Sequence, residues 1–183
     1  HRVDRRQRQM CIRDRANRAT EETISEVKEL FRNYLKEKKH RITPERFMVL
    51  EEIYRSDGHF DADEIYFKMK DNKSRVSRAT VYNTLDLLVD CGLVQRQQFG
   101  KNQSVYERAY SFQQHDHIIC QHCEAVVEFC DPRIHEIQQM MEKLHGFKIN
   151  DHSLHFYGDC KNPETCERKK EVEIKKMTKL TMN

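Results

Sequence analysis

The stretch HDHIICQHC, residues 115–123, decides the fold, because it places histidines and cysteines at the spacing of metal ligands. Cys120 and Cys123 form a Cys-x2-Cys knuckle, and after 36 intervening residues Cys160 and Cys166 form a Cys-x5-Cys pair. Short knuckles bring two thiolates to one tetrahedral zinc ion with little strain. The two pairs together predict a closed, structural Zn2+ site. The alternatives are disulfides, unrelated thiols or, for a lone Cys-x-x-Cys, a redox motif.

The histidines before the knuckle belong to a different kind of site. Side chains alternate along an extended strand, so His115 and His117 are expected on one face, with Asp116 and Cys120 on the other. One ion cannot easily take both sets. Nitrogen and oxygen ligands suit an exchangeable divalent ion such as Fe2+, Mn2+, Co2+ or Zn2+.

Length and composition limit the class of protein. A chain of 183 residues, 34% charged and 37% hydrophobic, has room for two small globular domains. It contains no run of about 18 apolar residues and no signal-peptide core, so we expect a cytoplasmic protein without a membrane span. Paired cysteine spacing within an odd total of 7 favours metal thiolates in a reducing compartment. Cys11, Cys91 and Cys130 remain, and we interpret them as buried or incidental thiols.

The two ends of the chain differ in composition from the middle. Of the formal net charge of +3, residues 1–19 contribute +5 and the remainder −2. These 19 residues lack apolar periodicity, which predicts a disordered or non-native leader, with a DNA-contacting basic arm as the alternative. Residues 169–183 are rich in lysine and predict a solvated tail.

Residues 20–107 contain the signals of four helices followed by a hairpin. A capping box at Thr23 and Glu26 predicts the first helix, and Thr43-Pro44 predicts the start of the second. Asp61 and Glu64 predict the third helix, and a fourth is expected from Ser77 to a stop at Gly92. Two strands are expected at residues 93–99 and 103–107 around a turn at 100–102. The apolar positions expected to face the core are Ile24, Val27, Leu30, Phe31, Tyr34, Leu35, Phe47, Leu50, Ile53, Tyr54, Val81, Leu85 and Leu88.

This order of elements is that of a winged helix-turn-helix, in which the last helix enters the major groove of DNA. Basic residues are concentrated before and at the start of that helix, which predicts a surface that faces phosphates, with a solvated loop as the alternative. Tyr82 is placed to contact a thymine methyl group and Asn83 to bind adenine, unless Tyr82 packs locally. The candidate DNA contacts are Arg46, Lys73, Arg75, Arg78, Thr80, Tyr82 and Asn83.

Residues 108–168 predict a second, α/β domain that contains the metal ligands. Residues 118–119 and 126–129 are expected to be strands joined by the cysteine knuckle. A helix follows Asp131-Pro132 and ends near Gly146, with Ile134, Ile137, Met141 and Leu144 facing inward. A last strand is expected at residues 153–157. Open strand edges in such a unit can pair across a two-fold axis, which predicts dimerisation.

The motifs SRATVY (77–82), HDHIICQHC (115–123), VEF (127–129) and HSLHFYG (152–158) resemble those of the ferric uptake regulator (Fur) family of metal-dependent repressors. The resemblance covers about residues 23–168. It implies an α+β protein, with an N-terminal winged helix-turn-helix followed by a small α/β dimerisation domain that contains a four-cysteine zinc site. It also implies a homodimer that binds a palindromic double-stranded DNA operator.

The resemblance also implies particular metal ligands. Structural zinc would use Cys120, Cys123, Cys160 and Cys166, although the last spacing is longer than the common two-residue form. A regulatory site at the hinge would use His59, Glu107, His115, His117 and Glu128. A third site would use Asp116, His135 and His152, with Gln114 and His135 replacing the usual histidine and glutamate; a hydrogen-bonded polar cluster is the alternative for these residues. His40, His122, His145 and His155 have no matching role.

Three functions fit these features. An Fe2+-dependent repressor of iron uptake genes is favoured, because peroxide sensors of the family carry Asp where Glu128 stands and zinc sensors often place Cys near Glu107. A zinc-uptake or peroxide-stress regulator is the alternative, since zinc outcompetes ferrous iron at most nitrogen and oxygen sites. A metal-dependent hydrolase is the distant alternative. Five ligands at one ion leave little room for the open coordination position that hydrolysis needs, so no enzymatic activity is expected.

Overall fold

The computed structural model describes residues 19–56, 58–98, 104–110 and 115–164, together with residues 166, 169, 172 and 177. The predictions for the leader, the 100–102 turn, Cys11, Gln114 and most of the tail therefore lie outside the described residues. The chain divides into two compact units, which we call the N-terminal unit (19–110) and the C-terminal unit (115–177) and describe separately. Among the described residues, every helix is too short or too polar to cross a membrane.

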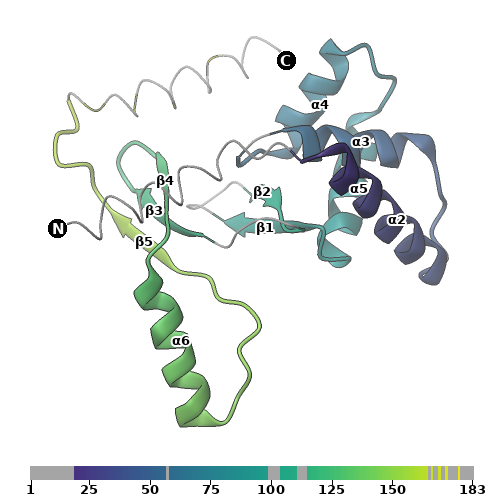
Figure 1. Cartoon of the computed structure of the whole chain (residues 1–183). Coiled ribbons are helices and arrows are strands. Elements are labelled where there is room, and N and C mark those ends of the chain that lie inside the picture. The colour runs from purple at the N-terminus through teal and green to yellow at the C-terminus, as the bar shows by residue number, and fades with distance from the viewer. Residues whose placement is uncertain are drawn as a thin grey trace. The chain divides into compact units, whose positions relative to one another are not determined.

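The N-terminal unit contains four helices followed by a two-stranded hairpin (Figure 1). The helices are α2 (Glu21–Glu37), α3 (Pro44–Arg55), α4 (Ala62–Asp71) and α5 (Arg78–Asp90). The antiparallel strands are β1 (Val94–Gln98) and β2 (Ser104–Arg108), with Val94 opposite Arg108 and Gln98 opposite Ser104. This is the predicted order of helices and hairpin.

Capping residues explain where most of these helices begin and end. The predicted capping box of α4 is present, because Asp61 Oδ1 accepts from the Glu64 backbone and Glu64 Oε2 accepts from the Asp61 backbone. Ser77 caps α5 by accepting from the Thr80 backbone, and Gly92 follows its end with a φ of +72°, which glycine adopts without strain. The prediction for α2 was wrong by one turn: the cap is Thr20, whose hydroxyl accepts from the Thr23 backbone.

The core of the N-terminal unit is one continuous apolar cluster to which all four helices and both strands contribute. Phe31 from α2, Leu50 from α3, Ile65 from α4 and Leu85 from α5 are fully buried. The Tyr54 hydroxyl donates to the Leu93 carbonyl at 2.7 Å, so this buried tyrosine also fixes the start of the hairpin.

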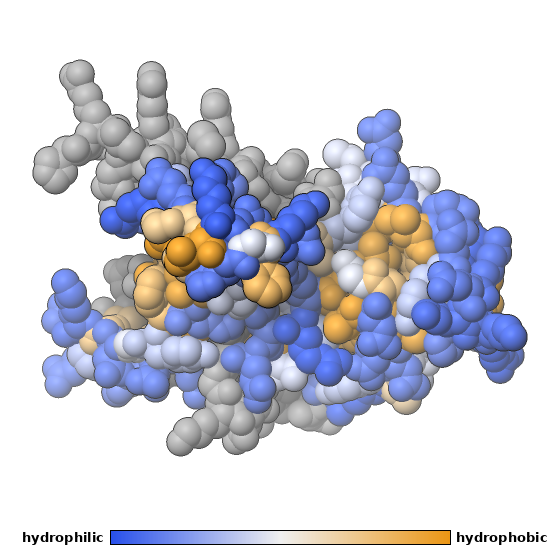
Figure 2. Space-filling model, turned by 90° about the horizontal axis from the view of Figure 1, so that it is seen from below, coloured by the Kyte–Doolittle hydropathy of each residue, from blue (hydrophilic) through white to orange (hydrophobic). Residues whose placement is uncertain are grey.

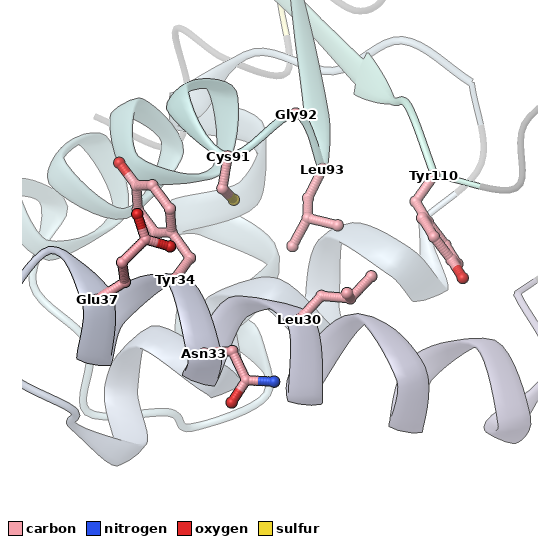
Figure 3. Close-up of a pocket in the computed structure, with 8 residues that line it drawn as sticks. All are labelled: Leu30, Asn33, Tyr34, Glu37, Cys91, Gly92, Leu93 and Tyr110. Carbon is pink, nitrogen blue, oxygen red and sulfur yellow. The ribbon is translucent and has the colours of Figure 1, made fainter.

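Leu30 does not join this core, contrary to the apolar stripe predicted for the first helix. Its side chain is 44% exposed and lines a hollow of about 320 Å³ between α2 and the residues after α5 (Figure 3). Tyr34, Cys91, Leu93 and Tyr110 line the same hollow. The stripe on α2 is wider than the surface that α3 and α5 cover, so only Ile24, Val27, Phe31 and Leu35 are buried.

The C-terminal unit contains a three-stranded sheet and one helix. The sheet order is β4 (Val126–Phe129), β3 (Asp116–Cys120) and β5 (His155–Gly158). Strand β3 is antiparallel to β4 and parallel to β5, and α6 (Pro132–His145) forms the connection between β4 and β5. Gly146 ends α6 with a φ of +69°, as the sequence predicted.

Helix α6 differs from the prediction, because none of its residues is buried. It extends away from the sheet of its own unit (Figure 1), leaving Ile137 53% exposed and Leu144 69% exposed. The predicted inward positions therefore do not face a core within this chain. Figure 2 shows hydrophobic residues, in orange, among the hydrophilic ones at the projecting part of this unit.

Candidate metal centres and DNA-binding surface

Cys120, Cys123 and Cys160 form one cluster, with their sulfur atoms within 4.8 Å of one another. Cys120 ends β3 and Cys123 follows in the turn to β4, where Glu124 takes a φ of +58° and donates its backbone N–H to the Cys120 carbonyl. Cys160 comes two residues after β5, which runs beside β3. None of these three cysteines forms a disulfide in the described structure.

Cys166 lies at the same cluster despite its longer spacing. Its sulfur atom is 3.9 Å from that of Cys123. Four sulfur atoms about 2.3 Å from a tetrahedral zinc ion are about 3.8 Å from one another. The distance therefore fits two thiolates on a shared ion.

The thiols of the cluster have unequal proton affinities. Burial raises the pKa of Cys120, but backbone N–H groups of Cys123, His122 and Cys160 outweigh it and lower that pKa to about 7. Burial, followed by hydrogen bonds and charge repulsion from Cys120 and Cys166, raises the pKa of Cys160 to about 12. One thiolate thus forms readily while its neighbours resist ionisation. A divalent cation removes this repulsion, so the donor set fits zinc.

Two of the predicted regulatory ligands lie together in the N-terminal unit. His59 Nε2 is 3.3 Å from Glu107 Oε2, and both side chains are largely buried. An isolated β-bridge causes this placement: the Phe60 and Tyr106 backbones exchange hydrogen bonds of 3.0 and 2.8 Å, so the adjoining residues 59 and 107 lie side by side. Glu107 Oε1 also accepts from Gln97 Nε2 at 3.2 Å, which orients the carboxylate.

The other three predicted regulatory ligands lie together in the C-terminal unit. The rings of His115 and His117 are 4.8 Å apart between centroids, at an interplanar angle of 71°. His117 is 2% exposed, and Glu128 is its partner across the β3–β4 pair. Directly opposite residues project to the same face of a sheet. Each unit therefore contributes imidazole and carboxylate groups of the kind that bind an exchangeable divalent ion.

The residues of the predicted third site are only partly assembled. Asp116 is 3% exposed, and its Oδ1 lies 3.4 Å from His152 Nε2, on the face of β3 expected from the strand alternation. His135 is elsewhere, on the first turn of α6, where its Nε2 is 2.9 Å from the Gln139 amide. Within the described parts of the chain, these three side chains do not come close enough to share an ion.

Sequence reasoning missed His155. Strand β5 pairs in parallel with β3 so that His155 is the partner of His117, and their rings are 5.4 Å apart. The sequence placed His155 in the last predicted strand, residues 153–157, but gave no sign that this strand lies beside the one that contains His117. Only knowledge of which strands are neighbours reveals it.

Apart from Arg46, which is on α3, the predicted DNA contacts lie on or next to the start of α5. Tyr82 is 43% exposed on the first turns of the helix, and Asn83 and Arg75 are also exposed. Lys73 is exposed in the loop before α5, where its φ is +57°. Thr80 is engaged in the helix cap, with its hydroxyl 2.8 Å from that of Ser77.

Arg46 and Arg78 are held by contacts within the unit. Arg46, on α3, donates to the Arg41 carbonyl. The guanidinium group of Arg78 lies over the rings of Tyr66 and Phe67, at 5.2 and 5.6 Å from their centroids. Sequence analysis counted the basic residues near α5 but missed Asp63 of α4, whose carboxylate reaches this surface.

The N-terminal unit is a winged helix with exposed polar and basic side chains on its last helix. The C-terminal unit contains thiolate and imidazole clusters. Together these features define a DNA-binding protein that also binds metals. Comparison with known proteins agrees with this class. The model of the ferric uptake regulator family matches residues 37–157. The chain therefore belongs to the ferric uptake regulator family, as the sequence motifs indicated, and it is a metal-responsive transcriptional regulator.

Individual relatives include regulators of two kinds. The peroxide operon regulator of Bacillus subtilis is 36% identical over 135 residues, which cover 74% of this chain and 90% of that protein. The ferric uptake regulation protein of Campylobacter jejuni is 35% identical over 134 residues, covering 72% and 85%. The structure of the Helicobacter pylori ferric uptake regulator, described as having three functional metal-binding sites, matches with a TM-score of 0.67 and 28% identity over 79% of this chain and 96% of that one.

Proposed function

We propose that this protein is a repressor that senses Fe2+ and controls iron uptake genes. The observation that carries the proposal is the presence of two half-sites: His59 beside Glu107 in the N-terminal unit, and His115 beside His117 in the C-terminal unit. Glu128 completes the second half-site. A single ion that takes ligands from both halves would fix the orientation of the winged helix, residues 20–107, relative to the dimerisation domain, residues 108–168.

The required energy is modest. A coupling free energy of about 1–3 kcal/mol per site, acting twice in a dimer, changes operator occupancy by orders of magnitude. The two half-sites contain mixed imidazole and carboxylate ligands, which exchange divalent ions more readily than four thiolates do. The cysteine cluster of Cys120, Cys123, Cys160 and Cys166 would meanwhile retain Zn2+ as a structural ion.

The proposed active form is a homodimer on a palindromic operator in the cytoplasm. Helix α6 exposes Ile137 and Leu144, and edge strand β5 exposes Phe156 and Tyr157 at 51% and 53%. A second copy of the unit is a suitable cover for this apolar surface, because the same patches meet across a two-fold axis. Two winged helices related by that axis would contact two operator half-sites.

A peroxide-responsive regulator is the second candidate, and the similarity to the Bacillus subtilis peroxide operon regulator favours it. Glu128 argues for iron sensing, as the family resemblance implies. A zinc-uptake regulator remains the third candidate, because nitrogen and oxygen ligands also accept Zn2+.

The test is anaerobic DNA binding by the full chain with Fe2+, Mn2+ or Zn2+ added to zinc-retaining protein. DNA fragments bound by the Fe2+ form are selected from genomic DNA of the source cell and sequenced. Recovery of iron uptake promoters, with release of DNA on Fe2+ removal, supports the proposal. Release of DNA by low peroxide, together with a mass gain of one oxygen on a histidine, would instead establish the peroxide candidate.

A further inference from the structure

Asp63 brings an acidic group to the DNA-binding surface. One of its carboxylate oxygens meets both Arg78 and Tyr82, two residues that are predicted to bind DNA. Its Oδ1 is 3.3 Å from Arg78 Nε and accepts a hydrogen bond from the Tyr82 hydroxyl, also at 3.3 Å. Asp63 comes from the first turn of α4, whereas Arg78 and Tyr82 come from the first turns of α5. One carboxylate oxygen therefore joins the two helices of the helix-turn-helix.

Both partners are held in this position by further interactions. The Arg78 guanidinium group lies over the rings of Tyr66 and Phe67, which restricts its rotation. Burial, followed by the charge and hydrogen bond of Asp63, raises the pKa of Tyr82, so its hydroxyl remains protonated and continues to donate. The N-terminus of α4 favours a negative charge at Asp63, and the capping box fixes that turn.

Stability alone is a poor explanation for this arrangement. Arg78 is 47% exposed and Asp63 is 36% exposed, and exposed ion pairs contribute little to folding. The carboxylate has a larger effect on DNA binding. It lies among the cations that are expected to face phosphates, and its negative charge repels those phosphates.

We propose that Asp63 is a specificity-determining positioning residue, an inference that rests on the DNA-binding function proposed above. On DNA of unrelated sequence, a phosphate must compete with the carboxylate for Arg78 and approach a negative charge. On an operator, Arg78 and Tyr82 already have the orientation in which they contact base edges, so the ion pair persists. Asp63 thereby lowers affinity for unrelated DNA more than affinity for the operator.

The test compares the full-length wild type with the variant Asp63→Asn, which keeps the shape of the side chain and removes its charge. Wild-type protein loaded with Mn2+ first selects a duplex from random DNA. Binding of each protein to that duplex and to a scrambled duplex of equal composition is then measured by fluorescence anisotropy at several salt concentrations.

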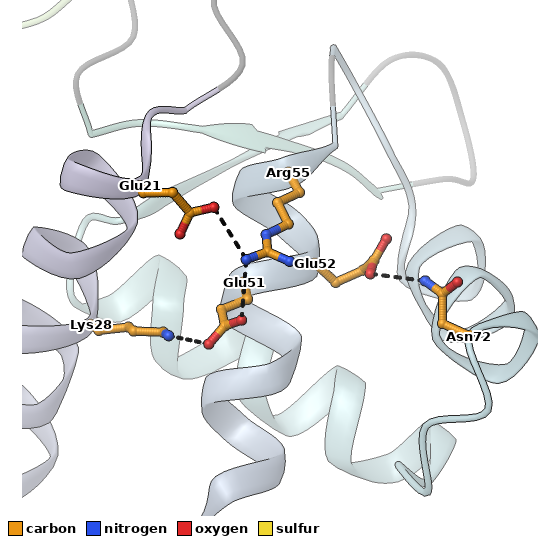
Figure 4. Close-up of polar contacts among 6 residues, drawn as sticks. All are labelled: Glu21, Lys28, Glu51, Glu52, Arg55 and Asn72. Atoms are coloured by element: carbon orange, nitrogen blue, oxygen red, sulfur yellow. Dashed lines mark hydrogen bonds and ion pairs between the residues drawn. The ribbon is translucent and has the colours of Figure 1, made fainter.

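The matched control is Glu51→Gln. Glu51 is also an acid that contacts two cations, Lys28 and Arg55, but it lies on α3 facing α2 (Figure 4). Replacing it removes the same charge from a comparable ion-pair network away from α5. Thermal unfolding of each variant checks that the fold is intact.

For Asp63→Asn, we expect about tenfold tighter binding to the scrambled duplex and a salt dependence of log K steeper by about 0.9, the value for one additional phosphate contact. The ratio of affinities for selected and scrambled duplexes falls accordingly, whereas Glu51→Gln leaves it unchanged. If Asp63→Asn behaves like Glu51→Gln, or weakens binding to both duplexes equally, this inference is wrong while metal-dependent DNA binding stands. Failure of the wild type to select any duplex overturns both.

Discussion

The two units of this protein bury apolar surface to very different extents. The N-terminal unit has a continuous core to which every helix contributes, including Phe31, Leu50 and Leu85. In the C-terminal unit, Ile119, Cys123 and Ala125 are the only buried hydrophobic residues among those the structure describes. Units with so little core need metals or oligomerisation for stability. The comparison suggests that the winged helix is stable through its own packing, whereas the second unit depends on its ligands.

Zinc removal should have the largest effect, and it should be confined to the C-terminal unit. Cys123→Ser removes one thiolate from the cluster, and structural zinc contributes about 10–16 kcal/mol of apparent binding free energy in small domains. We expect the variant to lose its zinc by native mass spectrometry and its amide protection in β3, β4 and β5 by hydrogen exchange, with α3 to α5 still protected.

Cys91→Ser is the control for that experiment. Burial raises the pKa of Cys91, whose thiol donates to the Leu88 carbonyl outside the cluster. This variant should retain zinc and all protection. A Cys123→Ser protein that keeps both zinc and a protected sheet would show that the second unit does not depend on the metal.

A cavity in the N-terminal core should have the opposite effect to zinc removal, because it should destabilise the N-terminal unit and leave the zinc site intact. Leu85→Ala removes a fully buried side chain, so the free energy of unfolding of this unit should fall by about 2–5 kcal/mol. Urea denaturation followed by hydrogen exchange measures this free energy of unfolding. The zinc content of the protein should not change. Leu30→Ala is the matched control, because Leu30 is 44% exposed and should cost far less. Equal losses at the two positions would contradict the assigned core.

A charge on α6 should separate dimerisation from folding. Leu144 is 69% exposed, so Leu144→Glu should leave the monomer folded but bury a charge in the proposed dimer interface. We expect the dimer dissociation constant to rise by at least about a hundredfold, the equivalent of about 3 kcal/mol. Light scattering over a dilution series measures this. Lys143→Glu, one residue earlier on the helix, is the control, and an unchanged dimer in Leu144→Glu would place the interface elsewhere.

The smallest effect concerns the local start of α6. Side-chain and backbone hydrogen bonds with Arg133 lower the pKa of Asp131 to about 2. A carboxyl group whose pKa is lowered on folding stabilises the fold above its unfolded pKa near 4, and this contribution is lost as the pH falls through about 2. Carboxyl NMR titration should give this low value, and Arg133→Gln should raise it. An unchanged pKa in Arg133→Gln would exclude the Arg133 side chain as its cause.

Local signals predicted most of the fold. Asp61 with Glu64, Ser77, Gly92 and Gly146 all mark element ends correctly, because capping depends on neighbours within one turn. The misplaced cap of α2 arose because Thr23 has a glutamate three residues on, at Glu26, whereas Thr20 has Thr23 at that position, so the capping-box pattern favoured the wrong threonine.

Tertiary partners explain what the sequence did not predict. The α6 stripe is apolar, but periodicity does not tell whether a stripe faces a core or another chain. Likewise, Asp63 on α4 has its partners on α5, and His155 on β5 has its partner on β3. These neighbouring elements are not evident from the sequence pattern. The pair His59 and Glu107 was placed by family resemblance, and the backbone bridge that joins them involves a pairing 46 residues apart, between Phe60 and Tyr106.

The central claim is that one divalent ion takes ligands from both units and thereby permits operator binding. The most direct measurement is anaerobic fluorescence anisotropy of the selected duplex during Mn2+ titration of wild type, His59→Ala and His117→Ala, each with its zinc content verified. The account predicts that the wild type binds only with Mn2+, that both single variants lose this response, and that a protein carrying both substitutions, titrated in the same way, is no worse than either. Metal-independent binding by the wild type, or a normal response in His59→Ala, would contradict it.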